Sequence, residues 1–192
     1  MKCTNNINYW NEIKNKKKGS PLTFIHTPKC GGSFVCSVLS LLNIKNKGHN
    51  RRTQNDGITF TVIRNPIQRF ESLMNYRLSE SKPRGDWPKS LRYVYKDKTI
   101  NLNQIIKQMS DKDIMNFSLY KTLCYWSKDI DIFITIDQLE DFLSCFEYDI
   151  DISSFQKINV SKKTRGRFNE NTKKRIARLY SKDLTFYNNV IQ

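Results

Sequence analysis

Leu22-Thr-Phe-Ile-His-Thr-Pro-Lys-Cys-Gly-Gly-Ser-Phe34 is the stretch that decides the fold of this chain of 192 residues. Residues 22–27 have the composition of a buried strand, and the apolar residues after Ser33 predict a helix to about residue 42. The loop between them combines Lys29 with two glycines. Glycines let the backbone approach an anion, and the first N–H groups of a helix point at it. The sequence therefore predicts a cradle for a phosphate-like group.

The order of residues in this loop excludes the common nucleotide-binding loop. A Walker A motif has a glycine, four residues and then Gly-Lys-Ser or Gly-Lys-Thr, whereas Lys29 precedes both glycines here. We therefore expect a phosphate-bearing ligand other than ATP or GTP.

A second strand-to-helix junction follows about thirty residues later. Residues 58–63 are β-rich, and Pro66 suits the first turn of a helix predicted over 66–78. Ligands bind at the carboxyl ends of strands in open α/β sheets. There Arg64 offers a planar fork of donors to a phosphate, and Ser72 can add a hydroxyl from the same side. Two anion sites are thus expected to line one crevice.

The alternation of strands and helices predicts an α/β fold with a central, mostly parallel sheet flanked by helices. A third strand is expected at 131–136. Further helices are expected at 102–109, 111–127, 137–146 and 172–180. Residues 1–20 read as a polar, basic N-terminal segment and residues 21–192 as a single domain.

The two junctions together resemble those of sulfotransferases that use 3′-phosphoadenosine-5′-phosphosulfate (PAPS), in particular carbohydrate and heparan-sulfate 2-O-sulfotransferases. Residues 25–33 are similar to their 5′-phosphosulfate loop and residues 60–72 to their 3′-phosphate motif. The resemblance implies a P-loop-like three-layer fold, PAPS as donor and 3′-phosphoadenosine 5′-phosphate (PAP) as product. The donor-binding residues that it implies are Thr27, Pro28, Lys29, Cys30, Gly31, Gly32, Ser33, Phe34, Arg64, Ser72, Lys163, Thr164 and Arg165.

Sulfuryl transfer to a hydroxyl needs a base, and the chain contains two histidines. His49 lies between the two donor motifs, where several carbohydrate sulfotransferases carry their catalytic histidine, so we expect it to be the base. His26 is expected to be a packed, hydrogen-bonded residue. Glu71 and Glu80 are the alternative bases. Lys29 is expected to meet the charge that develops on the bridging oxygen, and no metal is required.

Charge gives the strongest global signal. The chain has 33 Lys and Arg against 18 Asp and Glu, a formal charge of +15. Such a field favours an anionic ligand without choosing among anions. The resemblance implies a glycan hydroxyl as acceptor, and protein tyrosine, a lipid or a small metabolite stays open.

Two other function classes remain open. A P-loop kinase for a small metabolite would share the fold, but the Walker A lysine is missing. A nucleic-acid-binding protein would explain the charge, yet it has no need of both motifs at strand ends, so nucleic acid is not the expected partner.

Composition also bears on location. Five cysteines without a Cys-x-x-Cys pair predict neither a zinc site nor a disulfide framework. The chain has no run of 18 apolar residues, and its first residues lack the apolar core of a signal peptide. We therefore expect a soluble, cytoplasmic enzyme of a microbe or a virus, acting in the host cytoplasm or the virion in the viral case.

Overall fold

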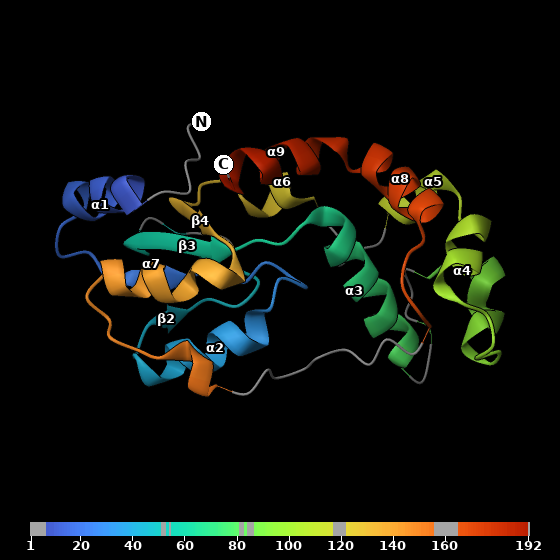
Figure 1. Ribbon diagram of the computed structural model, residues 1–192, viewed down its shortest axis with the longest axis horizontal. Coiled ribbons are helices and arrows are strands. Elements are labelled where there is room, and N and C mark those ends of the chain that lie inside the picture. Colours follow the sequence, from blue (N-terminus) through green and yellow to red (C-terminus); the bar gives the residue numbers. More distant parts are fainter. Residues whose placement is uncertain are drawn as a thin grey trace. The chain divides into compact units, whose positions relative to one another are not determined.

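The computed structural model describes residues 7–50, 53, 55–80, 83, 87–116, 122–155 and 165–191. The chain falls into two compact units, and Figure 1 labels the α-helices and strands β2, β3 and β4. The first unit comprises residues 1–64, 123–159 and 185–192. The second unit comprises residues 65–122 and 160–184.

The first unit is built on a four-stranded sheet in the order β2-β1-β3-β4, and every pair of neighbouring strands is parallel. The strands are β1 (Leu22–Phe24), β2 (Lys45–Asn46), β3 (Ile58–Val62) and β4 (Ile132–Ile134). The predicted α/β class, parallel sheet and flanking helices are thereby confirmed. Strand β2 was not predicted, because both of its residues are polar and exposed.

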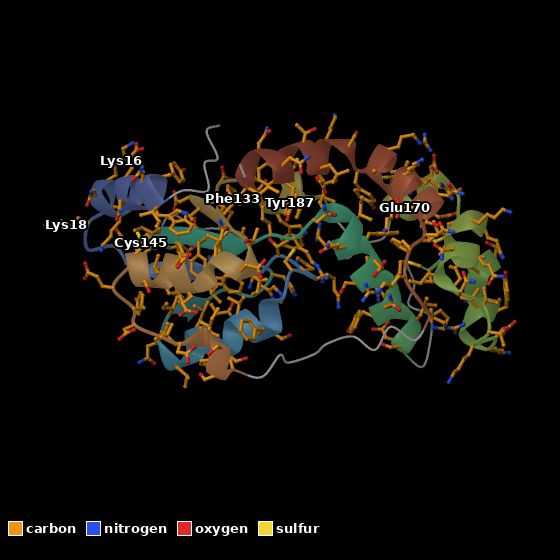
Figure 2. All side chains as sticks on the ribbon, in the orientation of Figure 1. Lys16, Lys18, Phe133, Cys145, Glu170 and Tyr187 are labelled. Atoms are coloured by element: carbon orange, nitrogen blue, oxygen red, sulfur yellow. The ribbon has the colours of Figure 1, made fainter. Side chains whose placement is uncertain are left out.

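Helices cover opposite faces of this sheet. Phe60 of β3 contacts Phe142 of α7 (Leu139–Cys145), with ring centroids 4.7 Å apart. Phe60 is in register with Ile132, so the next residue, Phe133, faces the other side of the sheet. There it meets Phe186 of α9 (Ser181–Ile191) edge-on at 5.2 Å. Figure 2 labels Phe133 on its strand.

The helix that follows the glycine loop is α2 (Gly32–Leu41), which buries Val35, Val38 and Leu39 in the core of the first unit. Its position agrees with the predicted helix. Short elements complete the unit: α6 (Leu123–Trp126) and the 3-10 turns η2 (Ile136–Gln138) and η3 (Ile152–Ser154).

Residues 7–16, within the segment read as polar and basic, form α1 (Ile7–Lys16). Trp10 is 2% exposed and meets Phe142 edge-on at 5.4 Å. The Tyr9 hydroxyl donates to the backbone oxygen of Asp131 at 3.0 Å, and Lys17 pairs with the Asp131 carboxylate at 2.8 Å. Part of the N-terminal segment therefore belongs to the core, attached to the start of β4.

The second unit is helical in the described residues. It contains α3 (Pro66–Ser79), the 3-10 helix η1 (Lys89–Tyr95), α4 (Leu102–Gln108), α5 (Asp111–Met115), α8 (Glu170–Leu179) and the start of α9. Asn65 caps α3, because its side-chain oxygen accepts from the backbone N–H of Ile67 at 3.0 Å. Phe70, Ile105 and Ile176 belong to one buried cluster, which joins α3, α4 and α8.

Two predicted helices need correction. The single helix predicted over 111–127 is wrong: α5 ends at the C-cap Asn116, and α6 is a separate helix that begins at Leu123. The last predicted helix corresponds to α8, but α9 follows it at once and was not predicted. None of the described helices is both long enough and apolar enough to span a bilayer.

Candidate functional site

The carboxyl ends of the four parallel strands meet at one edge of the sheet, and the predicted site residues of the first unit follow these ends. The segment from His26 to Lys29 follows β1, His49 follows β2 and Arg64 follows β3. Backbone hydrogen bonds extend the sheet toward them: His26 N donates to Gly48 O at 2.7 Å, and Ile63 N donates to Ile134 O at 2.8 Å. The structure thus brings Lys29, His49 and Arg64 to the same edge.

The glycine loop has a backbone that suits an anion. Lys29 and Gly31 both lie in the left-handed region, with φ of 64° and 85°. A non-glycine residue is uncommon there, and successive turns of this kind direct N–H groups into a concavity. Gly31 is the N-cap of α2 and provides no side chain to cap the helix. The first amides of α2, those of Gly32 and Ser33, lack acceptors within the helix.

The ring of His26 lies directly against Gly32. A Cβ atom placed on Gly32 would lie 1.7 Å from His26 Nε2, so no side chain fits there without displacing the imidazole. Gly31 is constrained differently, by its positive φ. The two glycines therefore have separate roles: Gly31 turns the chain into the helix, and Gly32 leaves room for His26.

His26 and His49 form a stacked pair, which joins the ends of β1 and β2. Their ring centroids are 4.3 Å apart at an interplanar angle of 30°. Nδ1 of His49 lies 2.8 Å from the backbone oxygen of His26. A carbonyl oxygen only accepts, which assigns the proton of this bond to Nδ1. In neutral His49 the lone pair is then on Nε2, and the exposed residue can accept a proton there.

His26 is the more buried member of the pair. Burial lowers the pKa of His26 from its ordinary value of 6.5 to about 4, and the charges of His49 and Lys29 act in the same direction. His26 is therefore neutral at pH 7 in the free protein. The ring of His26 is packed as predicted, since it stacks on His49, whereas the hydrogen bonds of this residue to Gly48 and His49 are made by its backbone.

Asp56 holds the loop that carries His49. Its carboxylate is buried and accepts from Lys47 Nζ at 2.6 Å, Lys45 Nζ at 3.1 Å and Thr53 Oγ1 at 2.9 Å. Burial opposes ionisation, but these hydrogen bonds together hold the pKa of Asp56 well below its ordinary value. Because Lys47 is two residues before His49 and its N–H donates to Phe24 O at 3.0 Å, Asp56 fixes the exit of β2.

Tyr187 is a residue of this edge that sequence reasoning missed. Burial raises the pKa of Tyr187, Asp137 and Cys30 raise it further, and Arg64 lowers it. The phenol on α9 is thus electrostatically coupled to the glycine loop, to the end of β3 and to the segment after β4. Figure 2 labels Tyr187. An aromatic residue in a C-terminal helix carries no local signal, so only the fold could reveal it.

The side chains of the other predicted loop residues make contacts within the first unit. Thr27 is buried, and its hydroxyl lies 2.8 Å from that of Thr61. The Cys30 thiol is also buried and donates to Pro28 O at 3.7 Å. Phe34 is partly buried and packs against Phe155, with ring centroids 6.4 Å apart. Their side chains support the loop, and the binding groups are left to Lys29 and the amides.

The predicted residues of the second unit have different environments. Ser72 is partly buried on α3. Arg165 is buried and donates to the backbone oxygens of Val94, Asp97 and Ile100 at 2.7–3.0 Å, which commits its guanidinium to the interior of this unit. Lys163 and Thr164 lie outside the described residues.

The two alternative bases are also engaged. The Glu71 carboxylate accepts from the backbone N–H of Phe168 at 2.8 Å. The Glu80 carboxylate accepts from Arg77 at 3.4 Å. Each of them therefore has a structural partner within the second unit.

Charge is divided unequally between the units. The first unit has 13 Lys and Arg against 10 Asp and Glu, and the second has 20 against 8. Acids of the second unit are engaged in pairs, such as Asp111 with Arg175 and Arg178. Its exposed cations for which the described residues provide no ion pair are Lys89, Arg92, Lys96, Lys98, Lys107, Lys112, Arg167, Lys174 and Lys182.

The edge of the first unit thus offers the ammonium group of Lys29, the first-turn amides of α2, the guanidinium of Arg64 and the exposed imidazole of His49. This set can bind an anion with two charged ends and can remove a proton beside it. No protein-family model matches the chain, and neither a curated protein nor a solved structure matches it.

Proposed function

We propose that this chain is a sulfotransferase that transfers the sulfuryl group of PAPS to a hydroxyl, on a P-loop-like three-layer fold. The observation that carries the proposal is the glycine loop before α2, which lies at the same sheet edge as Arg64 and His49. The sequence resemblance supplies the identity of the donor. The geometry supports it because PAPS has anionic groups at two ends and the edge has two cationic positions.

In this proposal the loop binds the 5′-phosphosulfate end of the donor. Lys29 and the amides of Gly31, Gly32 and Ser33 provide a full charge and directed N–H groups. Arg64 binds the 3′-phosphate, for which a planar guanidinium is well suited. Thr27, Pro28, Cys30 and Phe34 keep the loop in shape through buried contacts.

His49 is the proposed base. Its Nδ1–H is held by the backbone oxygen of His26, so Nε2 takes the proton of the acceptor hydroxyl. The hydroxyl oxygen attacks sulfur in line, and the bond from sulfur to the 5′-phosphate oxygen breaks. The electron pair of that bond stays on the phosphate, where Lys29 and the first-turn amides stabilise the added charge. The product nucleotide is PAP.

A glycan hydroxyl is the proposed acceptor, and features of the second unit support it. A pocket of about 540 Å³ in that unit includes Lys107 and Asn171 in its lining, and side chains of these types hydrogen-bond to sugar hydroxyls. The other amides of the lining already form hydrogen bonds at the starts of α4 and α8: they are Asn101, Asn103, Gln104 and Asn169. The charge excess of the same unit favours an acidic glycan over a neutral one.

A nucleic-acid-binding function is the second candidate, and the same charge excess is the observation that favours it. It would require phosphate contacts by the exposed lysines and would show a steep salt dependence. It leaves the glycine loop, Arg64 and His49 without a role, so we rank it below sulfuryl transfer.

Sulfuryl transfer is tested by incubating the protein with ³⁵S-labelled PAPS and a panel of glycans, both acidic and neutral, and by measuring label on the glycan and release of PAP. The proposal predicts labelling that is lost in His49→Ala. Binding of random RNA, with no labelling of any acceptor and no binding of PAP, would instead favour the second candidate.

A further inference from the structure

His26 lies where an anion held by the glycine loop would act on it. The position that a Cβ of Gly32 would take is 1.7 Å from His26 Nε2, 2.0 Å from Cδ2 and 2.3 Å from Cε1. The imidazole is therefore in direct contact with the first turn of α2. Gly32 has no side chain to separate the ring from a ligand on the first-turn amides.

The surroundings of His26 leave it uncharged in the free protein. From the β2 side the imidazole of His49 stacks on it at 4.3 Å, and from β1 the ring of Phe24 lies 6.0 Å away. The remaining charged group that acts on it is Lys29 of the loop. α2 contributes only Gly32 to this contact, and Trp126 of α6 faces His49 rather than His26. Within the described residues, no carboxylate contributes to the charge balance of His26.

We propose that His26 is a proton-linked ligand of the anion: it is neutral in the free protein and becomes an imidazolium when a sulfate or phosphate group occupies the glycine loop. The reason is a reversal of the local field. A bound dianion offsets Lys29 and adds opposite charge beside a ring whose charge balance includes no carboxylate of the described residues. This inference rests on the anion site of the proposed function but assigns His26 a role beyond packing.

Linkage gives the sign of the effect. The free protein holds the pKa of His26 at about 4, below its ordinary value, and the bound anion raises it. Between these two values binding takes up a proton, so affinity for the anion increases as the pH falls, by up to about tenfold per pH unit. Above the pKa of the complex the affinity no longer depends on His26.

The stacked partner sets a limit on this response. Two imidazolium rings at 4.3 Å repel, so a proton on His26 disfavours a second proton on His49. At a pH below the pKa that His26 has in the complex, the proton taken up on anion binding is therefore on the inner ring, the one that contacts Gly32.

The test is an NMR titration of the two histidine Cε1–H groups, with and without inorganic sulfate. The chain has only two histidines, and His49→Gln assigns the signals. Sulfate is the probe because it stays dianionic from pH 4.5 to 8, whereas phosphate monoesters titrate near pH 6. We expect sulfate to raise the titration midpoint of His26 by at least one pH unit.

The amides of Gly31 and Gly32 report binding in the same samples. Sulfate that shifts these amides but leaves the His26 midpoint in place would overturn the inference and leave the proposed function standing. If sulfate shifted neither the amide signals nor the His26 midpoint, both the inference and the proposed function would be overturned. A raised His26 midpoint in a protein that fails to bind PAP would support the inference and contradict the proposed function.

A variant provides the independent check. In His26→Gln, which keeps a polar side chain and cannot titrate, sulfate affinity should lose the pH dependence that the wild type shows between about pH 4 and the His26 midpoint measured with sulfate. Retention of the wild-type slope would contradict the proposal. Thermal melting shows whether the variant is folded, and the wild-type titration is decisive if it is not.

Discussion

His49 donates its Nδ1 proton to the backbone oxygen of His26, 2.8 Å away, while the two rings stack at 4.3 Å. These residues are 23 positions apart, and the parallel pairing of β1 with β2 brings them together. The bond leaves Nε2 of His49 as the basic nitrogen. The stack makes the protonation of either ring depend on the other. One backbone carbonyl thus orients the proposed base.

Lys29→Ala should reduce turnover by about 10²–10³-fold, because it removes the cation that meets charge on the leaving phosphate. The measurement is kcat with saturating PAPS. Lys18→Ala is the matched control, since Lys18 is an exposed lysine beyond the end of α1 and is labelled in Figure 2. An equal loss in both variants would remove Lys29 from its role.

Arg64→Ala should weaken the binding of PAP far more than that of adenosine 5′-phosphosulfate, which lacks the 3′-phosphate. Calorimetry on both ligands gives the comparison. Arg64 follows β3, at the same sheet edge as the glycine loop, so its loss should leave the 5′ end of the ligand bound. Equal losses of affinity for both ligands would show that Arg64 does not bind the 3′-phosphate.

Gly32→Ala should destabilise the first unit by about 1–3 kcal/mol, because the new methyl group would overlap the His26 ring. Denaturant unfolding measures the change. The double variant Gly32→Ala/His26→Ala makes room for the methyl group and should recover part of the loss. If the second substitution gave no recovery, the close approach of His26 would not be the cause.

Asp56→Asn should destabilise the protein at pH 7 by about 3–5 kcal/mol, since it breaks a buried ion pair with Lys47 and Lys45. The pKa of Asp56 is depressed in the folded state, so its stabilisation is present above the ordinary carboxyl pKa of 3.8 and is lost as the pH falls toward the folded value. The difference between wild type and variant should therefore shrink below about pH 4. Asp149→Asn, at an exposed carboxylate, is the control. A difference that stays constant down to pH 2 would contradict the assignment.

Charge reversal of Lys96 and Lys98 should weaken binding of an acidic glycan and reduce its salt dependence, because these exposed cations belong to the basic unit. The affinity for PAP should not change. Reversal of Lys16 and Lys18, labelled in Figure 2, supplies the same charge change in the first unit. Equal effects of the two sets would mean that net charge alone, and no local surface, governs glycan binding.

The glycine loop and the strand ends were predictable because their signals are local. Lys29, Gly31 and Gly32 lie within four positions of the sequence, and β3 is a continuous run of β-branched and aromatic residues. Two features could not be predicted from local sequence: the contact of His26 with Gly32, and the electrostatic coupling of Tyr187 to the glycine loop. Both arise from the way in which separate elements pack together. Elements β2 and α1 were not predicted for another reason. Most of their residues are polar or exposed, so they lack the apolar pattern by which strands and helices are recognised.

The same distinction explains Arg165. The resemblance implied that Arg165 binds the donor, yet its guanidinium donates to three backbone carbonyls of the second unit. The carbonyl groups that bind this guanidinium belong to residues about 65–71 positions away, so the sequence could not indicate the contact.

The melting temperature with and without PAP tests the central claim most directly, measured for wild type, Lys29→Ala and Arg64→Ala with ATP and ADP as controls. A ligand at about 100 times its dissociation constant adds about 2.7 kcal/mol, a shift of about 5–10 °C for a chain of this size. The account predicts this shift with PAP in the wild type, a much smaller shift with ATP or ADP, and its loss in both variants. No shift with PAP, or an equal shift with ATP, would contradict it.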